Sequence, residues 1–176
     1  MKTKLTIYIF LISFAIFGQS FTEKYEDIDD VTSVIVTEEM FKMLGSITPE
    51  GENAKEEIEA LKDLTGLIII STDNPQYKDQ MLKDAQNYIQ KKNMKELLRI
   101  NDKEANVKFY VIKGDKDYIA KELVMIVVKK TNPAETVIMD LTGTIDLRKL
   151  SKLNSKVNMV DKKYFEEVEQ KMNHNE

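Results

Sequence analysis

Histidine and the carboxylates are the side chains of this chain that could carry acid–base or metal chemistry. The chain has 176 residues and a single histidine, His174, which lies close to its end in the polar sequence NHNE. A zinc ligand or a general base must be held rigidly, and this sequence offers no apolar anchor. We interpret His174 as a solvated tail residue and predict no metal site and no cofactor.

Acidic residues are densest just before the first apolar run, at Glu26, Asp27, Asp29 and Asp30. A calcium loop needs alternating oxygen ligands, a central glycine and a distal glutamate. Ile28 breaks the alternation and no glycine follows, so the pattern favours a solvated acidic segment over a cation site.

Other carboxylates have structural explanations. Asp73, with Asn74, is typical of a helix cap, and Asp115 and Asp117 are typical of a tight turn. The sequence contains no GxSxG, SxxK, P-loop or GxGxxG motif, and it has no cysteine. We therefore predict no catalytic residue. A hydrolase that uses carboxylates and tyrosines from distant positions stays open, because one sequence would not reveal such a pair.

The first twenty residues indicate export. Lys2 and Lys4 precede an uncharged run at residues 5–17, and Gly18 provides a small residue for cleavage. We predict a signal peptide at residues 1–18, cleaved to leave a periplasmic or secreted protein without a stable membrane anchor. A retained N-terminal anchor is the alternative. Loss of the two lysines changes the net charge from −4 to −6, which gives no electrostatic reason to bind nucleic acid.

Residues 19–176 are predicted to form one domain, in which strand and helical patterns alternate, four strands follow in succession, and two helical segments end the chain. The expected class is α+β: a two-layer sandwich with a mixed, mostly antiparallel sheet of about six strands and helices packed on it. Strands are expected at 31–37, 67–70, 96–101, 107–112, 119–130 and 136–141. Helices are expected from 38, with Thr37 as the cap, around 54–61, from 75, from 147 and at 161–172.

The fifth of these strands is apolar on both faces. Leu123, Met125 and Val127 point one way, whereas Val124, Ile126 and Val128 point the other. One helical layer covers one face of a sheet, so the second face is either covered by the C-terminal helices or open. If it is open, Val124, Ile126 and Val128 are the expected binding residues for a partner protein or an apolar ligand.

Two stretches resemble an uncharacterised exported family of Gram-negative bacteria, DUF4252. They are FTEKYEDIDDVTSVIVTEEMFKML at residues 21–44 and MDLTGTIDLRKLSKL at 139–153. The resemblance implies an exported α+β domain and a link to envelope-stress regulation. Members of the family are often lipoproteins, but this chain lacks the cysteine that a lipid anchor requires.

These observations favour a non-catalytic binding module of the cell envelope, whose partner is an envelope protein or an apolar ligand. The oligomeric state is not predicted. The alternatives are the carboxylate and tyrosine hydrolase and a structural envelope protein that associates with itself through an edge strand.

Overall fold

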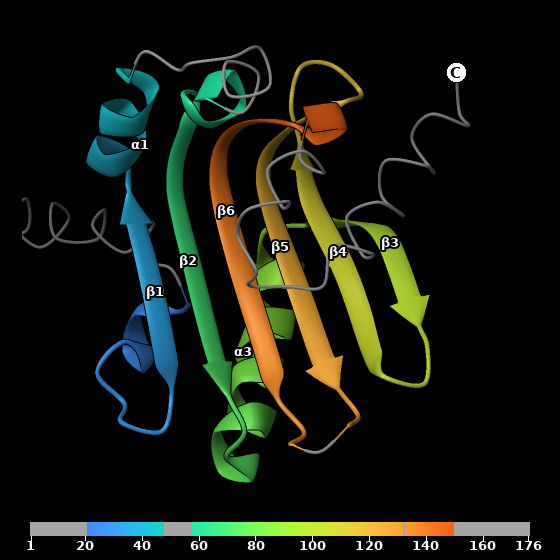
Figure 1. The fold of residues 1–176 in the computed structure, drawn as a ribbon. Helices are drawn as coiled ribbons and strands as arrows, with labels where there is room; N and C mark the ends of the chain where they lie inside the picture. The colour runs from blue at the N-terminus through green and yellow to red at the C-terminus, as the bar shows by residue number, and fades with distance from the viewer. Residues whose placement is uncertain (1–20, 48–57, 132, 150–176) are drawn as a thin grey trace, which may run out of the picture.

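The computed structural model describes residues 21–47, 58–131 and 133–149. Within these ranges six strands form one sheet in the spatial order β1-β2-β6-β5-β4-β3 (Figure 1). The strands are β1 (Thr32–Thr37), β2 (Leu64–Thr72), β3 (Lys95–Asn101), β4 (Ala105–Lys113), β5 (Ile119–Lys129) and β6 (Thr136–Asp146).

The predicted α+β class is confirmed, and so is the meander that joins β3 to β6 in order. All five strand pairings are antiparallel, so the sheet is antiparallel throughout rather than mixed. The position of β2 explains why the sheet has no parallel pair. It pairs with β6, the last strand, and the chain after β2 crosses to the far edge of the sheet before it enters β3.

Two helices have the caps that the sequence predicted. α1 (Glu38–Gly45) follows Thr37, whose hydroxyl accepts a 3.4 Å hydrogen bond from the Met40 N–H. α3 (Pro75–Lys91) follows Asn74, whose side chain accepts a 3.0 Å bond from the Gln76 N–H. Each cap satisfies an N–H group that has no partner inside its helix.

Parts of other predicted helices are also helical, at residues 58–61 and 147–149. The start of the first, the end of the second and the predicted helix at 161–172 lie outside the described residues. The predicted signal peptide and His174 lie outside them too.

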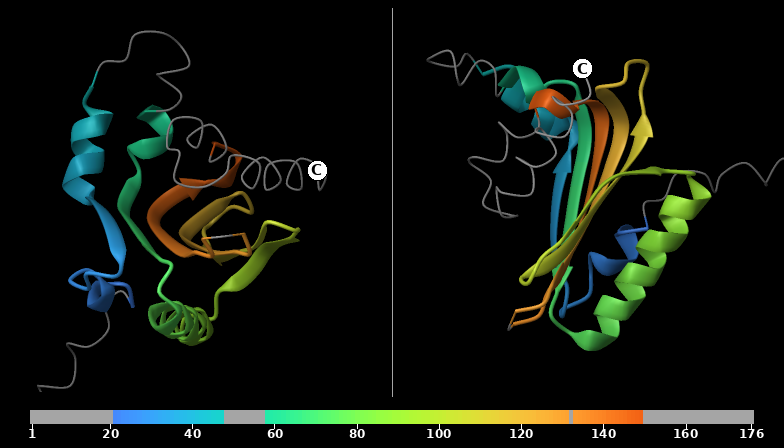
Figure 2. Two further views of the ribbon diagram at one scale, coloured as in Figure 1. Left: turned by 60° about the horizontal axis from the view of Figure 1, so that its bottom comes forward. Right: turned by 90° about the vertical axis from the view of Figure 1, so that its right-hand side faces the viewer.

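The two faces of the sheet bury separate clusters, as the alternation in β5 predicted. Leu123, Met125 and Val127 belong to one cluster, which Phe41 of α1 and Leu147 join. Val124 and Ile126 belong to the other. Figure 2 shows α3 and the N-terminal segment (residues 21–31), which contains a short 3-10 turn (Glu23–Tyr25), on the same face of the sheet. This face is the one that bears Val124 and Ile126.

Two backbone positions make the topology possible. Asn93 adopts a left-handed φ of 52° directly after α3 and redirects the chain into β3. Gly143 has a φ of 124° where β6 passes the start of β2, and a Cβ atom there would lie 2.5 Å from the Asp63 carbonyl oxygen. Glycine is required at this crossing because any side chain would collide with backbone.

Candidate functional site

The residues predicted to bind a partner lie in the core. Val124 is fully buried and Ile126 is 5% exposed, because Met81, Ala85 and Ile89 of α3 pack in the same cluster. Val128 is half-buried at the end of β5. On this face α3 and the N-terminal segment pack over the sheet, whereas the predicted C-terminal helix at 161–172 lies outside the described residues. A binding role for these three residues stays a prediction, and it requires α3 to move off the sheet.

The same face holds a buried polar cluster beneath the end of α3. Glu122 and Asp140 lie on the neighbouring strands β5 and β6, and both are buried. The Glu122 carboxylate accepts a 2.7 Å hydrogen bond from the Nζ of Lys92. The Lys92 ammonium also lies 4.6 Å from the centre of the Tyr88 ring, within range of a cation–π interaction.

Tyr88 connects this cluster to the surface. Burial raises the pKa of the Tyr88 hydroxyl well above its usual value, and its hydrogen bond to Glu122 raises it further. The negative charges of Asp140 and Glu122 act in the same direction. Tyr88 is therefore a neutral hydrogen-bond donor at physiological pH and not a base.

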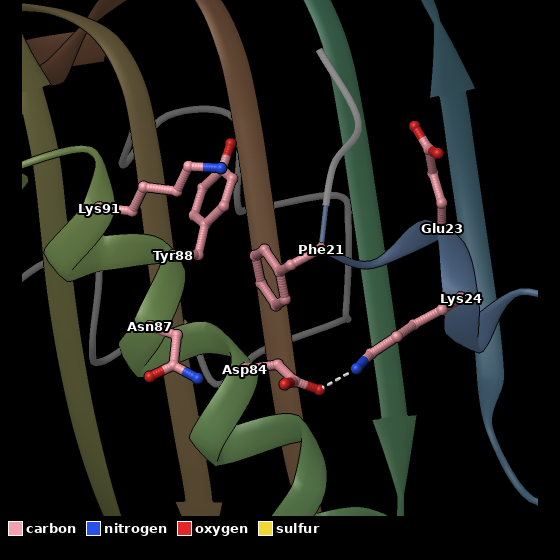
Figure 3. Close-up of a pocket in the computed structure, with 7 residues that line it drawn as sticks. All are labelled: Phe21, Glu23, Lys24, Asp84, Asn87, Tyr88 and Lys91. Atoms are coloured by element: carbon pink, nitrogen blue, oxygen red, sulfur yellow. Dashed lines mark ion pairs between the residues drawn. The ribbon is translucent and has the colours of Figure 1, made fainter. Parts of the chain in front are cut away.

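A cleft of about 560 Å³ lies between α3 and the N-terminal segment (Figure 3). The ring of Phe21 packs against that of Tyr88 with 4.8 Å between the ring centres. Lys24 forms an ion pair with Asp84, and the buried Tyr25 donates a hydrogen bond to the same carboxylate. The lining residues are Phe21, Glu23, Lys24, Asp84, Asn87, Tyr88 and Lys91.

Asp84 has a structural role in this cleft. Partial burial acts to raise the pKa of Asp84, but the hydrogen bonds from Lys24 and Tyr25 more than offset it and hold that pKa below its usual value. The carboxylate is thus ionised at neutral pH and cannot act as a general acid. It ties the N-terminal segment to α3.

A different kind of surface lies at the opposite end of the sheet from β3. β1 is an edge strand, and its sequence TSVIVT contains no charge, proline or glycine. It contributes no buried residue. Among the described residues, all the exposed large hydrophobic side chains lie in this strand and the helix region after it. They are Val34, Ile35, Met40, Met43 and Ile47, and we call them the β1–α1 surface.

Both faces of β1 contribute to this surface. Val34 pairs with Ile69 and so lies on the face of the cluster that contains Phe41. Ile35 pairs with Ile68 and lies on the α3 face. Ile35 is 47% exposed and Met43 is 67% exposed. The sequence predicts the strand and the helix but not the exposed surface, because a β-branched run has the same pattern in a central strand and in an edge strand.

The acidic residues before β1 are exposed at Asp27, Asp29 and Asp30. Asp30 accepts a 2.9 Å hydrogen bond from the side chain of Asn74, and its backbone carbonyl accepts one from Thr72. Within the described ranges no group of acidic or histidine side chains is arranged to hold a metal ion. In the same ranges, no helix combines the length and the apolar character needed to cross a bilayer.

Comparison with protein families matches residues 25–153 to the family described as a domain of unknown function, DUF4252. The match covers more than half of the chain. This chain belongs to the DUF4252 family. The match includes β1, α1 and all the strands of the sheet, so the β1–α1 surface lies within the family domain. No curated protein and no solved structure matches the chain.

Proposed function

We propose that this DUF4252 protein is a non-catalytic interaction module of the cell envelope that binds a protein partner through the β1–α1 surface. The observation that carries the proposal is the concentration of exposed apolar side chains on an uncharged edge strand and the helix that follows it. Exposed large apolar side chains that are concentrated in one region of a protein often mark an interaction site.

The backbone of β1 supports the same proposal. β1 pairs with β2 on one side, and on its other side it has no strand neighbour in the described part of the chain. An edge strand presents a row of N–H and C=O groups that an incoming strand can bond. Proteins commonly bind extended peptides in this way, with the backbone supplying affinity and alternate side chains supplying specificity.

The predicted export of the chain supports the location that we propose. The signal peptide predicted at residues 1–18 would deliver the domain to the periplasm or to the medium. The family resemblance adds a role in envelope-stress regulation. An interaction module suits that role because a regulator acts by binding another protein.

The hydrolase alternative has less support from the geometry. The structure brings Glu122 and Asp140 onto neighbouring strands, but both are buried, and neither is among the residues that line the cleft. The raised pKa of Tyr88 and the lowered pKa of Asp84 leave neither group suited to take or give a proton at neutral pH. The alternative stays a prediction from the sequence.

Site-specific photo-crosslinking in the producing cells tests the proposal. A photo-reactive residue is placed at Thr32 on β1 or, as the matched control, at Asn101 on β3, since both side chains are exposed on edge strands. We expect a discrete protein adduct from position 32 and none from position 101. Val34→Lys in the same chain should reduce the adduct at least ~10-fold, because it places a charge in the apolar contact.

Absence of an adduct from position 32, or equal adducts from both positions, would contradict the proposal. Urea unfolding of each variant must first show that the fold is intact. Val34 is 39% exposed, so lysine can reach water there without disturbing the core.

A further inference from the structure

Acidic side chains lie at both ends of β1. Asp27, Asp29 and Asp30 precede the strand, and Glu38 and Glu39 follow it at the start of α1. All five are exposed. Glu38 forms a 2.7 Å ion pair with Lys42 one helical turn away. Lys24, which precedes the acidic residues before β1, is paired with Asp84. The uncharged strand is thus bounded by negative charge on each side.

This arrangement disfavours a second copy of the chain as the partner at β1. Two copies paired antiparallel along β1 would place the acidic residues before the strand of one copy beside Glu38 and Glu39 of the other. Like charges that face each other across paired strands are destabilising. The same charges attract a segment with basic residues at its ends.

The length of the strand sets the size of the segment. Six residues of β1 span roughly 20 Å at about 3.4 Å per residue. A segment of similar length could bond the free edge of the strand while residues beyond it reach the acidic groups. Because both ends of β1 are acidic, a basic residue at either end of the segment finds an opposite charge in either chain direction.

We infer that the occupant of the β1–α1 surface is an extended segment of a protein partner, with a β-branched apolar centre flanked at both ends by lysine or arginine. This inference rests on the proposed function and names the chemistry of its partner. The apolar centre covers Val34 and Ile35, and the basic ends pair with the acidic residues before and after the strand.

Peptide titration tests the inference on the mature protein, residues 19–176. The probes are the peptides KKTVIVTKK and EETVIVTEE, which share one apolar centre and differ only in the charge of their ends. We expect the lysine peptide to bind at least ~10-fold more tightly at low salt, and the difference to shrink as ionic strength rises.

Charge reversal on the protein provides the matched control. Asp29→Lys with Glu39→Lys leaves Asp27, Asp30 and Glu38 against two lysines, and should therefore remove most of the advantage of the lysine peptide. Asp115→Lys with Asp117→Lys changes the net charge equally in the turn between β4 and β5, where both side chains are fully solvated, and should leave the preference as it was.

Each other outcome is decisive. If both peptides bind equally and Ile35→Lys abolishes both, the β1–α1 surface binds strands without charge selection, and the inference fails while the proposed function stands. Unchanged preference after Asp29→Lys with Glu39→Lys, or no binding by either peptide, also overturns the inference. In sedimentation, a dimer abolished by Ile35→Lys would replace the peptide partner with a second copy. The crosslinking experiment decides the proposed function separately.

Discussion

The two edges of the sheet are built differently. β3 contributes two residues to the core, Leu98 and Ile100, and it carries charged residues at Lys95, Glu96 and Arg99. Its pairing with β4 contains a register shift, and Glu96 and Arg99 form a 2.6 Å ion pair. β1 has no charge, no register shift and no buried residue.

The two edges therefore differ in how strongly they resist the addition of a further strand. Charges and irregular pairing on an edge strand discourage a further strand from adding to the sheet. β3 has both devices. β1 has neither, and its protection against pairing with itself comes from the acidic residues beyond its ends.

The largest effect should come from truncating the same residue type on the two edges. Ile100 is 8% exposed and Ile35 is 47% exposed. Ile100→Ala should lower the free energy of unfolding by about 2–4 kcal/mol, because it removes buried methyl groups and leaves a cavity. Ile35→Ala should cost less than about 1 kcal/mol. Urea unfolding measures both, and equal losses would mean that β1 is as much a part of the core as β3.

A buried and an exposed Lys–Glu ion pair should differ in their contribution to the free energy of unfolding. Lys92 pairs with the buried Glu122, whereas Lys42 pairs with the exposed Glu38. Lys92→Met leaves a buried carboxylate without its cation and should lower the free energy of unfolding by about 1–3 kcal/mol. Lys42→Met should leave it nearly unchanged, because exposed ion pairs contribute little. A loss confined to the Lys42 variant would contradict this assignment.

Uncharging β3 should make it resemble β1. We expect Lys95→Thr, Glu96→Val and Arg99→Val together to leave the protein folded but to make it associate at rising concentration, because the edge loses its charges and becomes apolar. Sedimentation at rising concentration compares this variant with the wild type. Identical profiles would show that the charges on β3 do not guard the edge.

The smallest effect concerns pH. The pKa of Asp84 is lowered in the folded protein, so the carboxylate contributes stability above its unfolded pKa, near 3.8, and loses it as pH falls through the lower folded pKa. Asp84→Asn should therefore make acid unfolding less steep below about pH 4 and weaken the connection between the N-terminal segment and α3. Urea midpoints between about pH 2 and 7 measure this, and parallel curves for both proteins would contradict it.

Much of the fold could be predicted because strand and helix patterns are local. Thr37 and Asn74 predicted where the two helices start, and the apolar residues on both sides of β5 predicted two buried faces of the sheet. β2 and β6 extend beyond the predicted runs, to Leu64–Thr72 and Thr136–Asp146, because pairing with neighbours continues a strand through polar residues.

The candidate site could not be predicted in the same way. Strand order depends on long-range pairing, so nothing in the sequence TSVIVT places β1 at an edge. The sequence left open whether the face of Val124 and Ile126 is covered, because it did not reveal that α3 packs on that face of the sheet. Glu122 and Asp140 lie in apolar strands, and only the fold brings them together.

Amide hydrogen exchange of residues 19–176 with and without the peptide KKTVIVTKK tests whether β1 binds an extended segment. We expect amides in β1, residues 32–37, to gain protection when the peptide binds, while those of β3, residues 95–101, do not change. Protection that appears at β3, or only around Tyr88 in the cleft beside α3, would contradict this expectation.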